Sequence, residues 1–410
     1  MDTITTEDTL GIAFSRRLPL AFSHGTGSRV WDEHGKVYLD FTSGWGVNSM
    51  GHAHPVMVQA LTNQASKLIQ GPNAAFTYSP VRASLLQTMR TVLPGHLSRI
   101  YFCNSGAEAN DAVLKLARKM TGRSEVISTL GSFHGRSLAT LSVSRGPDNP
   151  ARFLPPQQHT RFVPHGDIAA LEQALSSDTA ALIVEPVQGE GGVRIPPMDW
   201  LAKAERLCRQ HGALLILDEV QTGFCRTGRF FAHQHSPEPI RADIITMAKG
   251  IAGGFPFAAF AVSESVYEGL QPDDHGGTYN GNPLGCAVAD VVIRYLRDKE
   301  VATRVASLGE RLITRLHALH AQHPGIIQAI RGQGLLTAME LHDQDQVRNL
   351  AFACADAGLL VVPTRNGVIR LLPDLLVSEA DLDAGLDILT AVLAAHANAA
   401  HDIAPLASAG

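Results

Sequence analysis

The sequence predicts an α/β fold built on a mostly parallel sheet. Short runs rich in β-branched residues alternate with segments of helical period, as in AALIVEP (180–186), MDWLAKAERLCRQHG (198–212) and ALLILDEV (213–220). Such βαβ units imply parallel strands that are covered by helices. Because ligands of these folds bind outside the carboxyl ends of the strands, polar residues at those ends are the candidates for function.

The composition is that of an enzyme with one large core or two joined cores. The 410 residues are 45% hydrophobic and 18% charged, and the net charge of -5 comes from intermixed signs. We therefore expect small-molecule ligands, with no nucleic acid and no membrane as partner. The five cysteines show no CxxC spacing, and the N-terminus MDTITTEDTL matches neither a signal nor a transit peptide. With no apolar run long enough to span a bilayer, the expected location is cytoplasmic.

The two ends of the chain are expected to meet in a smaller α+β domain. Three strand-like segments follow the helical stretches around 284–320: GLLTAMEL (334–341), LLVVPT (359–364) and GVIRLLP (367–373). GSRVWDEHGKVYLDF (27–41) is typical of a β-hairpin with its turn at Glu33-His34-Gly35, and we expect it to pack with the C-terminal part. The expected division is an N-terminal segment over 1–48, a large domain over 49–292, a small domain over 293–395 and a flexible tail over 396–410.

Lys249 differs in its setting from the other lysines. It closes an apolar run, ADIITMAK (242–249), and a glycine-rich turn, GIAGGF (250–255), follows at once. A lysine at the end of a strand inside a cleft can be desolvated, which favours a neutral amine able to attack carbonyls. A lysine whose apolar stem packs along the sheet explains the pattern equally well.

Asp218 ends the hydrophobic strand ALLIL, as Lys249 ends its own. If the two strands are parallel, both side chains project into the same crevice. A lone carboxylate beside apolar strands is costly unless a positive group accompanies it. A protonated pyridine nitrogen would supply that charge, and a metal ion or a buried ion pair are the alternatives.

The segment FCNSGAEANDAVLKLARK (102–119) has the pattern of a strand end followed by a helix. Ser105 and Glu108 stand at capping-box spacing, and Gly106 and Ala107 leave the backbone accessible. The free N–H groups and positive dipole of a helix N-terminus suit a phosphate, although capping alone is an ordinary feature of helices.

GSFHGR (131–136) follows the strand-like VIST (126–129). Phe133 is placed to stack on a flat heteroaromatic ring, and Arg136 to reach a carboxylate. A core phenylalanine and a surface arginine are the plain alternatives for these two residues.

Six motifs in order along the chain carry a family resemblance: SGAEAN (105–110), FHGR (133–136), EPVQGEGG (185–192), LDEVQTGFCRTG (217–228), AKGIAGGFP (248–256) and TYNGNP (278–283). Together they resemble the class III aminotransferases, and within them the acetylornithine and ornithine aminotransferases. The likeness covers the chain from about residue 20 to 390. It implies an aspartate-aminotransferase-like fold (fold type I), with a mostly parallel seven-stranded sheet, helices on both faces and a smaller α+β domain.

The resemblance implies pyridoxal 5′-phosphate as cofactor. Lys249 matches the Schiff-base lysine, which also moves the proton of the substrate carbon, and Asp218 matches the partner of the pyridine nitrogen. The other implied cofactor-binding positions are Phe133 and Val220 on the ring faces, Gln221 near the ring hydroxyl, Glu185 and His134 beside them, and Ser105, Gly106 and Ala107 at the phosphate. Thr278 matches a threonine that reaches the phosphate of the neighbouring subunit, so a homodimer with shared active sites is implied.

The resemblance also implies the substrates. Arg370 matches the arginine for the carboxylate next to the reacting carbon of 2-oxoglutarate, and Arg136 the arginine for its far carboxylate. Glu190 matches a glutamate that neutralises Arg370 while an amine without that carboxylate is bound. A ping-pong transfer of a terminal amino group to 2-oxoglutarate follows, with N-acetylornithine as the leading donor.

Trp45 departs from the acetylornithine branch, which has a small or aliphatic residue there. Its indole would narrow the entrance for the amine. GPNAAFTY (71–78) and HGGTYNGNP (275–283) also leave the donor open between N-acetylornithine and 4-aminobutyrate, ornithine or another ω-amino acid or diamine.

Other function classes fit the sequence less well. Arg136 and Arg370 argue against an aminomutase or racemase, which needs no keto acid. A regulator on the same fold needs a DNA-binding head, but only about 25 residues precede the hairpin. Neither GxGxxG after a strand nor GxxxxGK occurs, which argues against dinucleotide binding. We predict no metal: the two His-x-His pairs, His52 with His54 and His233 with His235, are interpreted as loop histidines.

Overall fold

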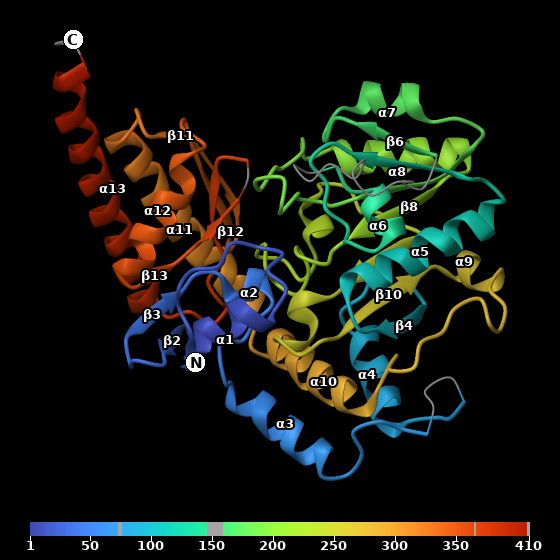
Figure 1. Cartoon of the computed structure of the whole chain (residues 1–410). Helices are drawn as coiled ribbons and strands as arrows, with labels where there is room; N and C mark the ends of the chain where they lie inside the picture. The colour runs from blue at the N-terminus through green and yellow to red at the C-terminus, as the bar shows by residue number, and fades with distance from the viewer. Residues whose placement is uncertain (73–75, 146–158, 365, 408–410) are drawn as a thin grey trace.

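A seven-stranded sheet forms the centre of the larger part of the molecule (Figure 1). The computed structural model describes residues 1–72, 76–145, 159–364 and 366–407, with side chains up to residue 398. The strands, in order across the sheet, are β4 (Arg99–Cys103), β10 (Ala258–Val262), β9 (Ile244–Met247), β8 (Leu214–Asp218), β7 (Thr179–Val184), β5 (Glu125–Thr129) and β6 (Thr160–Val163). β10 is antiparallel to both of its neighbours, and the remaining pairs are parallel. The predicted mostly parallel seven-stranded sheet is confirmed.

Alternate residues of the central strands face two different layers of helices. In β7, Leu182 and Val184 join a core cluster with Trp200 of α8 (Trp200–His211) and with α10 (Pro283–Asp298). Ala181 and Ile183 join the opposite cluster with α5 (Gly106–Thr121). Successive side chains of a strand point to opposite faces, so β7 is apolar from Ala180 to Val184 because both of its faces are buried. The other helices of this part are α3 (Pro55–Ala65), α4 (Pro80–Arg90), α6 (Leu138–Ser142), α7 (Ile168–Ala174), α9 (Glu264–Glu268), η2 (Ala232–His235) and η3 (Lys249–Ala252).

Both ends of the chain build the second, smaller part. One sheet contains β1 (Phe22–Thr26), β2 (Arg29–Asp32), β3 (Val37–Asp40) and β13 (Leu359–Leu360), and the other β11 (Ile327–Gln333), β12 (Leu336–Leu341), β15 (Val368–Leu371) and β14 (Val362–Pro363). The helices are α1 (Thr3–Leu10), α2 (Ser43–Gly46), α11 (Val301–Gln322), α12 (Gln346–Asp356) and α13 (Glu379–Ala407). β2 and β3 form the predicted hairpin, and β13 pairs with β3. The prediction that this hairpin packs with the C-terminal part is therefore confirmed.

The C-terminal helix continues further than the sequence suggests. We expected a tail from residue 396, but the backbone is helical in α13 as far as Ala407, and residues 408–410 lie outside the described part. Alanine has the highest helix propensity, so an Ala-rich end continues a helix readily. The proposed domain boundary between 292 and 293 falls inside α10, whose end at Asp298 is a better proposal for it.

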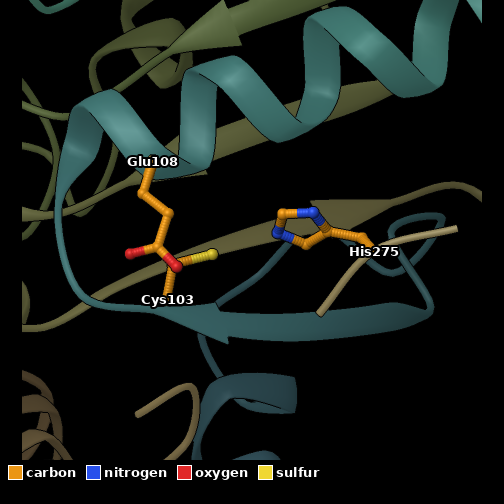
Figure 2. Close-up of side chains that lie close together, drawn as sticks. All are labelled: Cys103, Glu108 and His275. Carbon is orange, nitrogen blue, oxygen red and sulfur yellow. The ribbon is translucent and has the colours of Figure 1, made fainter. Parts of the chain in front are cut away.

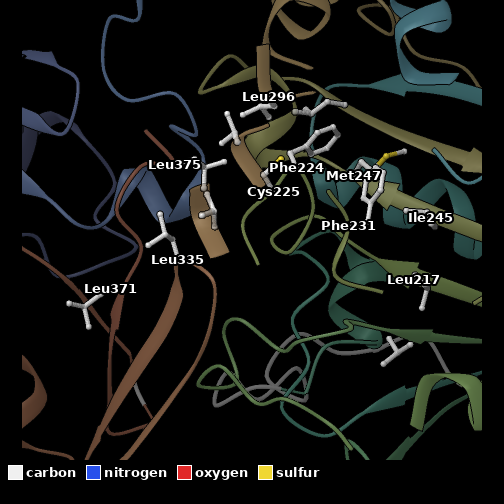
Figure 3. Close-up of a cluster of buried hydrophobic side chains, with 14 of the residues drawn as sticks. Leu217, Phe224, Cys225, Phe231, Ile245, Met247, Leu296, Leu335, Leu371 and Leu375 are labelled. Atoms are coloured by element: carbon white, nitrogen blue, oxygen red, sulfur yellow. The ribbon is translucent and has the colours of Figure 1, made fainter. Parts of the chain in front are cut away.

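One hydrophobic cluster joins the two parts. Figure 3 shows Leu217 and Met247 of the large sheet in the same cluster as Cys225, Leu335 and Leu371, which lie beyond it. The junction between the parts is thus a packed apolar core, which holds the loops above it in a fixed arrangement. All five cysteines are buried free thiols, and no described helix has the length and apolarity needed to cross a bilayer.

Candidate active site

A cavity of about 420 Å³ opens at the carboxyl ends of β8 and β9. Asp218 is the last residue of β8, Lys249 follows the end of β9, and both line the cavity. Because β8 and β9 are parallel neighbours with Asp218 opposite Thr246, the prediction that both side chains share one crevice is confirmed. The lining also contains these predicted residues: Ser105, Gly106, Ala107, Phe133, His134, Arg136, Glu185, Glu190, Val220 and Gln221.

The Asp218 carboxylate is buried and held from three sides. Its Oδ2 accepts a hydrogen bond from Asn110 Nδ2 at 2.7 Å and lies 2.7 Å from His134 Nδ1, while Oδ1 accepts from the Val220 N–H at 2.9 Å. Asn110 was not predicted as a site residue; its own Oδ1 accepts from Thr246 Oγ1 at 2.6 Å. Its position four residues after Gly106, on the same face of α5, is the signal that could have found it. A carboxylate fixed in this way suits a protonated ring nitrogen.

Lys249 stands in a strained turn and lines the cavity. Its φ of 46° lies in the left-handed region, where a residue with a Cβ is disfavoured. Burial lowers the pKa of the ammonium; Glu190 opposes this shift and Arg370 adds to it. Within the described part of the chain, Nζ has no hydrogen-bond partner. A desolvated amine of this kind is a nucleophile toward carbonyl carbon.

The N-terminus of α5 forms one end of the cavity. Ser105 Oγ accepts from the Glu108 N–H at 3.2 Å, as predicted for the N-cap. Glu108 in return accepts from the N–H of Asn104 at 2.9 Å, one residue before the N–H of a capping box. A Cβ on Gly106 would lie 2.8 Å from Val220 Cγ1, so the close approach of Val220 requires glycine here. The free N–H groups of this 16-residue helix suit a phosphate.

Phe133 and Val220 provide apolar groups for a flat ring. Arg136 is exposed, with its guanidinium carbon 4.9 Å from the centre of the Phe133 ring. Behind them, the buried Glu185 accepts from the N–H groups of Phe133 at 2.9 Å and Gly189 at 3.1 Å. Burial raises the pKa of Glu185 to about 7; the charge of His134 opposes this shift. Glu185 thus fixes the backbone of both turns.

Arg370, on β15, is fully buried behind the cavity lining. Its Nη2 donates to Glu190 Oε1 at 2.8 Å and its Nη1 to Gln221 Oε1 at 3.2 Å. Its Nε is buried and finds no partner among the described residues. Burial alone would raise the pKa of Glu190, but Arg370 and Lys249 outweigh it and the pKa is lowered. The pair is therefore ionised, with unused donor capacity on the arginine.

Two predicted residues are not brought into the cavity by this chain. Trp45 lies in the left-handed turn of α2 with φ 64°; the residue is 52% exposed, and its carbonyl accepts from Gln221 Nε2 at 3.4 Å. Thr278 is exposed, and its carbonyl accepts from Gln70 Nε2 at 2.6 Å. The roles of both side chains stay predictions.

Cys103, Glu108 and His275 point toward one another beneath α5 (Figure 2). Their possible ligand atoms all lie within 4.8 Å of one another. However, Lys115 Nζ lies 3.2 Å from His275 Nδ1, and Asn104 donates twice to one oxygen of Glu108. The ammonium opposes a second cation, and the carboxylate already supports the start of α5, so we assign this group to the support of the helix.

Three of the four predicted loop histidines are hydrogen-bonded to groups of the protein. His52 Nε2 lies 2.8 Å from Asp40 Oδ2, and His233 Nδ1 lies 2.9 Å from Glu219 Oε1. His235 Nε2 lies 3.0 Å from the Thr227 carbonyl oxygen. The His54 ring packs edge-on against Tyr295, and its buried Nδ1 has no partner among the described residues.

Fold and site together define a pyridoxal-phosphate-dependent transferase of fold type I. A helix N-terminus for the phosphate, an apolar slot for the ring, a fixed carboxylate for its nitrogen and a desolvated lysine meet in one cavity. The family model of the class-III aminotransferases matches residues 13–393. The chain belongs to this family.

Relatives and solved structures agree with this assignment. The chain is 42% identical to an acetylornithine aminotransferase of Methanothermobacter thermautotrophicus, over 92% of this chain and 94% of the relative. It is 39% identical to one of Neisseria meningitidis, with the same coverage of 92% and 94%. The ornithine aminotransferase structure from Toxoplasma gondii superposes with a TM-score of 0.89 at 33% identity, covering 96% of this chain and 95% of that one. The acetylornithine aminotransferase structure from Elizabethkingia anophelis gives 0.84 at 33% identity, with 95% and 97% covered.

The membership fixes the type of reaction. The protein is an aminotransferase, its cofactor is pyridoxal phosphate, and its substrates are a small-molecule amine and a keto acid.

Proposed function

We propose that the protein transfers the terminal amino group of N-acetylornithine to 2-oxoglutarate. The donor leaves as an aldehyde and 2-oxoglutarate leaves as glutamate, in two successive half-reactions. The relatives named above that carry the name acetylornithine aminotransferase support this donor. The observation that carries the proposal is the ion pair of the buried Arg370 with the partly exposed Glu190 beside Lys249.

The cofactor residues have distinct tasks in this proposal. Bound pyridoxal phosphate withdraws electrons from the substrate carbon that loses its proton. Lys249 holds the cofactor and moves that proton, since burial lowers the pKa of its amine and favours the neutral form. Asp218 keeps the proton on the ring nitrogen, because His134 and Asn110 fix its carboxylate. The first turn of α5 holds the phosphate through its N–H groups.

The pair of Arg370 and Glu190 lets one pocket accept two different substrates. 2-Oxoglutarate has a carboxylate next to its reacting carbon, and Arg370 can bind it with both nitrogens once Glu190 has left. A terminal amine has no such carboxylate, so Glu190 has to stay and neutralise the arginine. Glu190 is able to move because its side chain is 29% exposed and glycine stands on either side, at 189 and 191. Arg136 would bind the far carboxylate from its exposed position.

We further propose a homodimer in which Thr278 reaches the phosphate of the neighbouring site. Next to Thr278, and in the segment between α3 and α4, the chain exposes large apolar side chains that a second copy would cover: Leu68, Ile69, Phe76, Tyr78 and Tyr279. Exposed patches of this kind mark interaction surfaces. The mass of the holoenzyme in solution tests this. We propose the cytoplasm as the compartment, in keeping with five free thiols.

A donor panel tests the substrate. N-Acetylornithine, ornithine and 4-aminobutyrate are each mixed with the holoenzyme without keto acid, and the cofactor absorbance is followed. N-Acetylornithine should give the fastest change, and 2-oxoglutarate should then reverse it. A response to ornithine alone would favour the second candidate, which the Toxoplasma gondii structure supports. No response to any terminal amine would reject the proposal.

A further inference from the structure

The Arg226 guanidinium is buried at the junction of the two parts of the molecule. The residue is 2% exposed, and its Nη1 donates to the carbonyl oxygens of Leu335 at 3.0 Å and Pro373 at 2.6 Å. Burial lowers its pKa to about 10, and the nearby Asp374 opposes this shift. Burying a guanidinium costs desolvation free energy, so Arg226 is expected to have a specific role at this place. The cofactor and substrate residues assigned above do not include it.

The two carbonyl groups lie at the open end of one β-ladder. β12 and β15 pair with Ala338 opposite Arg370 and Thr337 opposite Leu371. Two residues beyond the second pair, the same register brings Leu335 opposite Pro373. Proline has no N–H, so this last rung cannot form in the usual way. Arg226 Nη1 bonds to both carbonyls instead and closes the ladder three residues from Arg370.

The backbone around Arg226 makes the same connection. The Leu335 N–H donates to the Arg226 carbonyl at 3.0 Å. A Cβ on Gly334, whose φ is 58°, would lie 2.7 Å from that oxygen, so this approach requires glycine. Arg226 also follows β8 by a short loop that contains Gln221, which itself binds Arg370. One loop therefore starts at Asp218, the predicted partner of the cofactor nitrogen, and ends at Arg226, which binds the end of the strand that carries Arg370.

We propose that Arg226 is a positioning residue for the keto acid. Arg226 bonds the end of β15 to the loop after β8. It thereby fixes the position of Arg370 relative to Asp218 and Lys249. This inference rests on the proposed use of Arg370 for the carboxylate of 2-oxoglutarate. Since a terminal amine does not bind Arg370, a displaced Arg370 slows the acceptor half-reaction and leaves the donor half-reaction nearly unchanged. Displacement by a fraction of an ångström is enough to weaken a two-nitrogen contact.

Arg226→Lys is the main test, because it keeps the charge and shortens the reach to the two carbonyls. Each half-reaction is followed by cofactor absorbance in the holoenzyme, with N-acetylornithine and then with 2-oxoglutarate. We expect kcat/KM of the acceptor half-reaction to fall about tenfold, through KM, and the donor half-reaction to stay within about twofold. Arg226→Met should give a larger acceptor loss. Asp374→Asn, which removes the nearby charge, should give a smaller loss and stands in for Arg226→Met where that variant does not fold.

Arg304→Lys is the matched control. Arg304 Nη2 donates to the Val377 carbonyl at 2.7 Å, four residues after Pro373, away from the cavity lining. It should change neither half-reaction. Equal losses in both half-reactions of Arg226→Lys, or no loss in either, would overturn the positioning role. Arg370→Lys is measured in parallel: an intact acceptor half-reaction there rejects the proposed function itself, whereas a loss in Arg370→Lys alone rejects only the role of Arg226.

Discussion

Asp218 and Arg370 are both buried charges at the active site, but their surroundings differ. Asp218 is fixed by Asn110, His134 and the Val220 N–H, which come from separate segments. Arg370 is bonded to Glu190, which is partly exposed, and to Gln221, while its Nε has no partner among the described residues. A charged group that binds one permanent ligand can have all its other hydrogen-bonding positions filled by the protein. A charged group that binds two ligands in turn has to keep some hydrogen-bond donors free.

Lys249 stands between these two regions, and its removal should have the largest effect. Lys249→Ala should abolish both half-reactions, with at least about a 10⁴-fold loss of turnover, because the base and the attachment of the cofactor are lost together. Turnover and cofactor absorbance are measured on folded protein. Lys203→Ala is the control, since Lys203 is a half-exposed lysine on α8 that pairs with Asp199, the N-cap of that helix. Turnover near the wild-type level in Lys249→Ala would contradict the assignment.

We call Asp218 and the cofactor-binding residues around it the fixed region. A change in the fixed region should slow both half-reactions equally. Asp218→Asn keeps the shape and removes the charge, so the ring nitrogen loses its counter-ion for either substrate. We expect about a 10³-fold fall in the rate of each half-reaction. Single-turnover absorbance measurements with each substrate check this. A fall in the rate of only one half-reaction would contradict the assignment of Asp218 to the cofactor rather than to one substrate.

The sequence predicted the fixed region well because its signals are local. Asp218 and Lys249 end apolar runs, Ser105 and Gly106 start a helix, and in a parallel sheet such ends meet. Asn110 was missed because its contact with Asp218 joins residues 108 positions apart. The role of Asn110 cannot be predicted until the position of α5 on the sheet is known.

We call Arg370 and the substrate-binding residues around it the alternating region. Its arrangement could not be predicted, because it depends on features that a sequence pattern does not contain. The role inferred for Arg226 follows from the register of β12 on β15, which brings Leu335 opposite Pro373. Trp45 stands in a left-handed turn and does not line the cavity of this chain, so the narrowing of the entrance by its indole stays a prediction. Tertiary register and backbone strain, rather than residue type, determine these placements.

Glu190→Gln should separate the two half-reactions in opposite directions. Without the carboxylate, Arg370 attracts the keto acid more strongly and lies uncompensated beside the amine donor. We expect KM for 2-oxoglutarate to fall about tenfold and the donor kcat/KM to fall about tenfold. Measuring both half-reactions on one preparation is the check. A change of the same sign in both would contradict the alternating use of Arg370.

The smallest expected effect concerns stability and returns to the fixed region. Burial raises the pKa of Glu185 from an ordinary value of 4.5 to about 7, and the negative charge of Asp218 adds to this shift. Between these two pH values the folded protein keeps a proton that the unfolded chain has released, so this group lowers stability as the pH rises through that window and changes nothing further above it.

Glu185→Gln removes this titration. The melting temperature of the variant, measured with saturating pyridoxal phosphate, should therefore fall less than that of the wild type between pH 4.5 and about 7. Glu268→Gln, on the exposed end of α9, is the matched control and should keep the wild-type slope. Parallel slopes for wild type and Glu185→Gln would mean that Glu185 stays ionised throughout. In that case the hydrogen bonds from Phe133 and Gly189 outweigh burial, and the fixed region holds a second permanent negative charge.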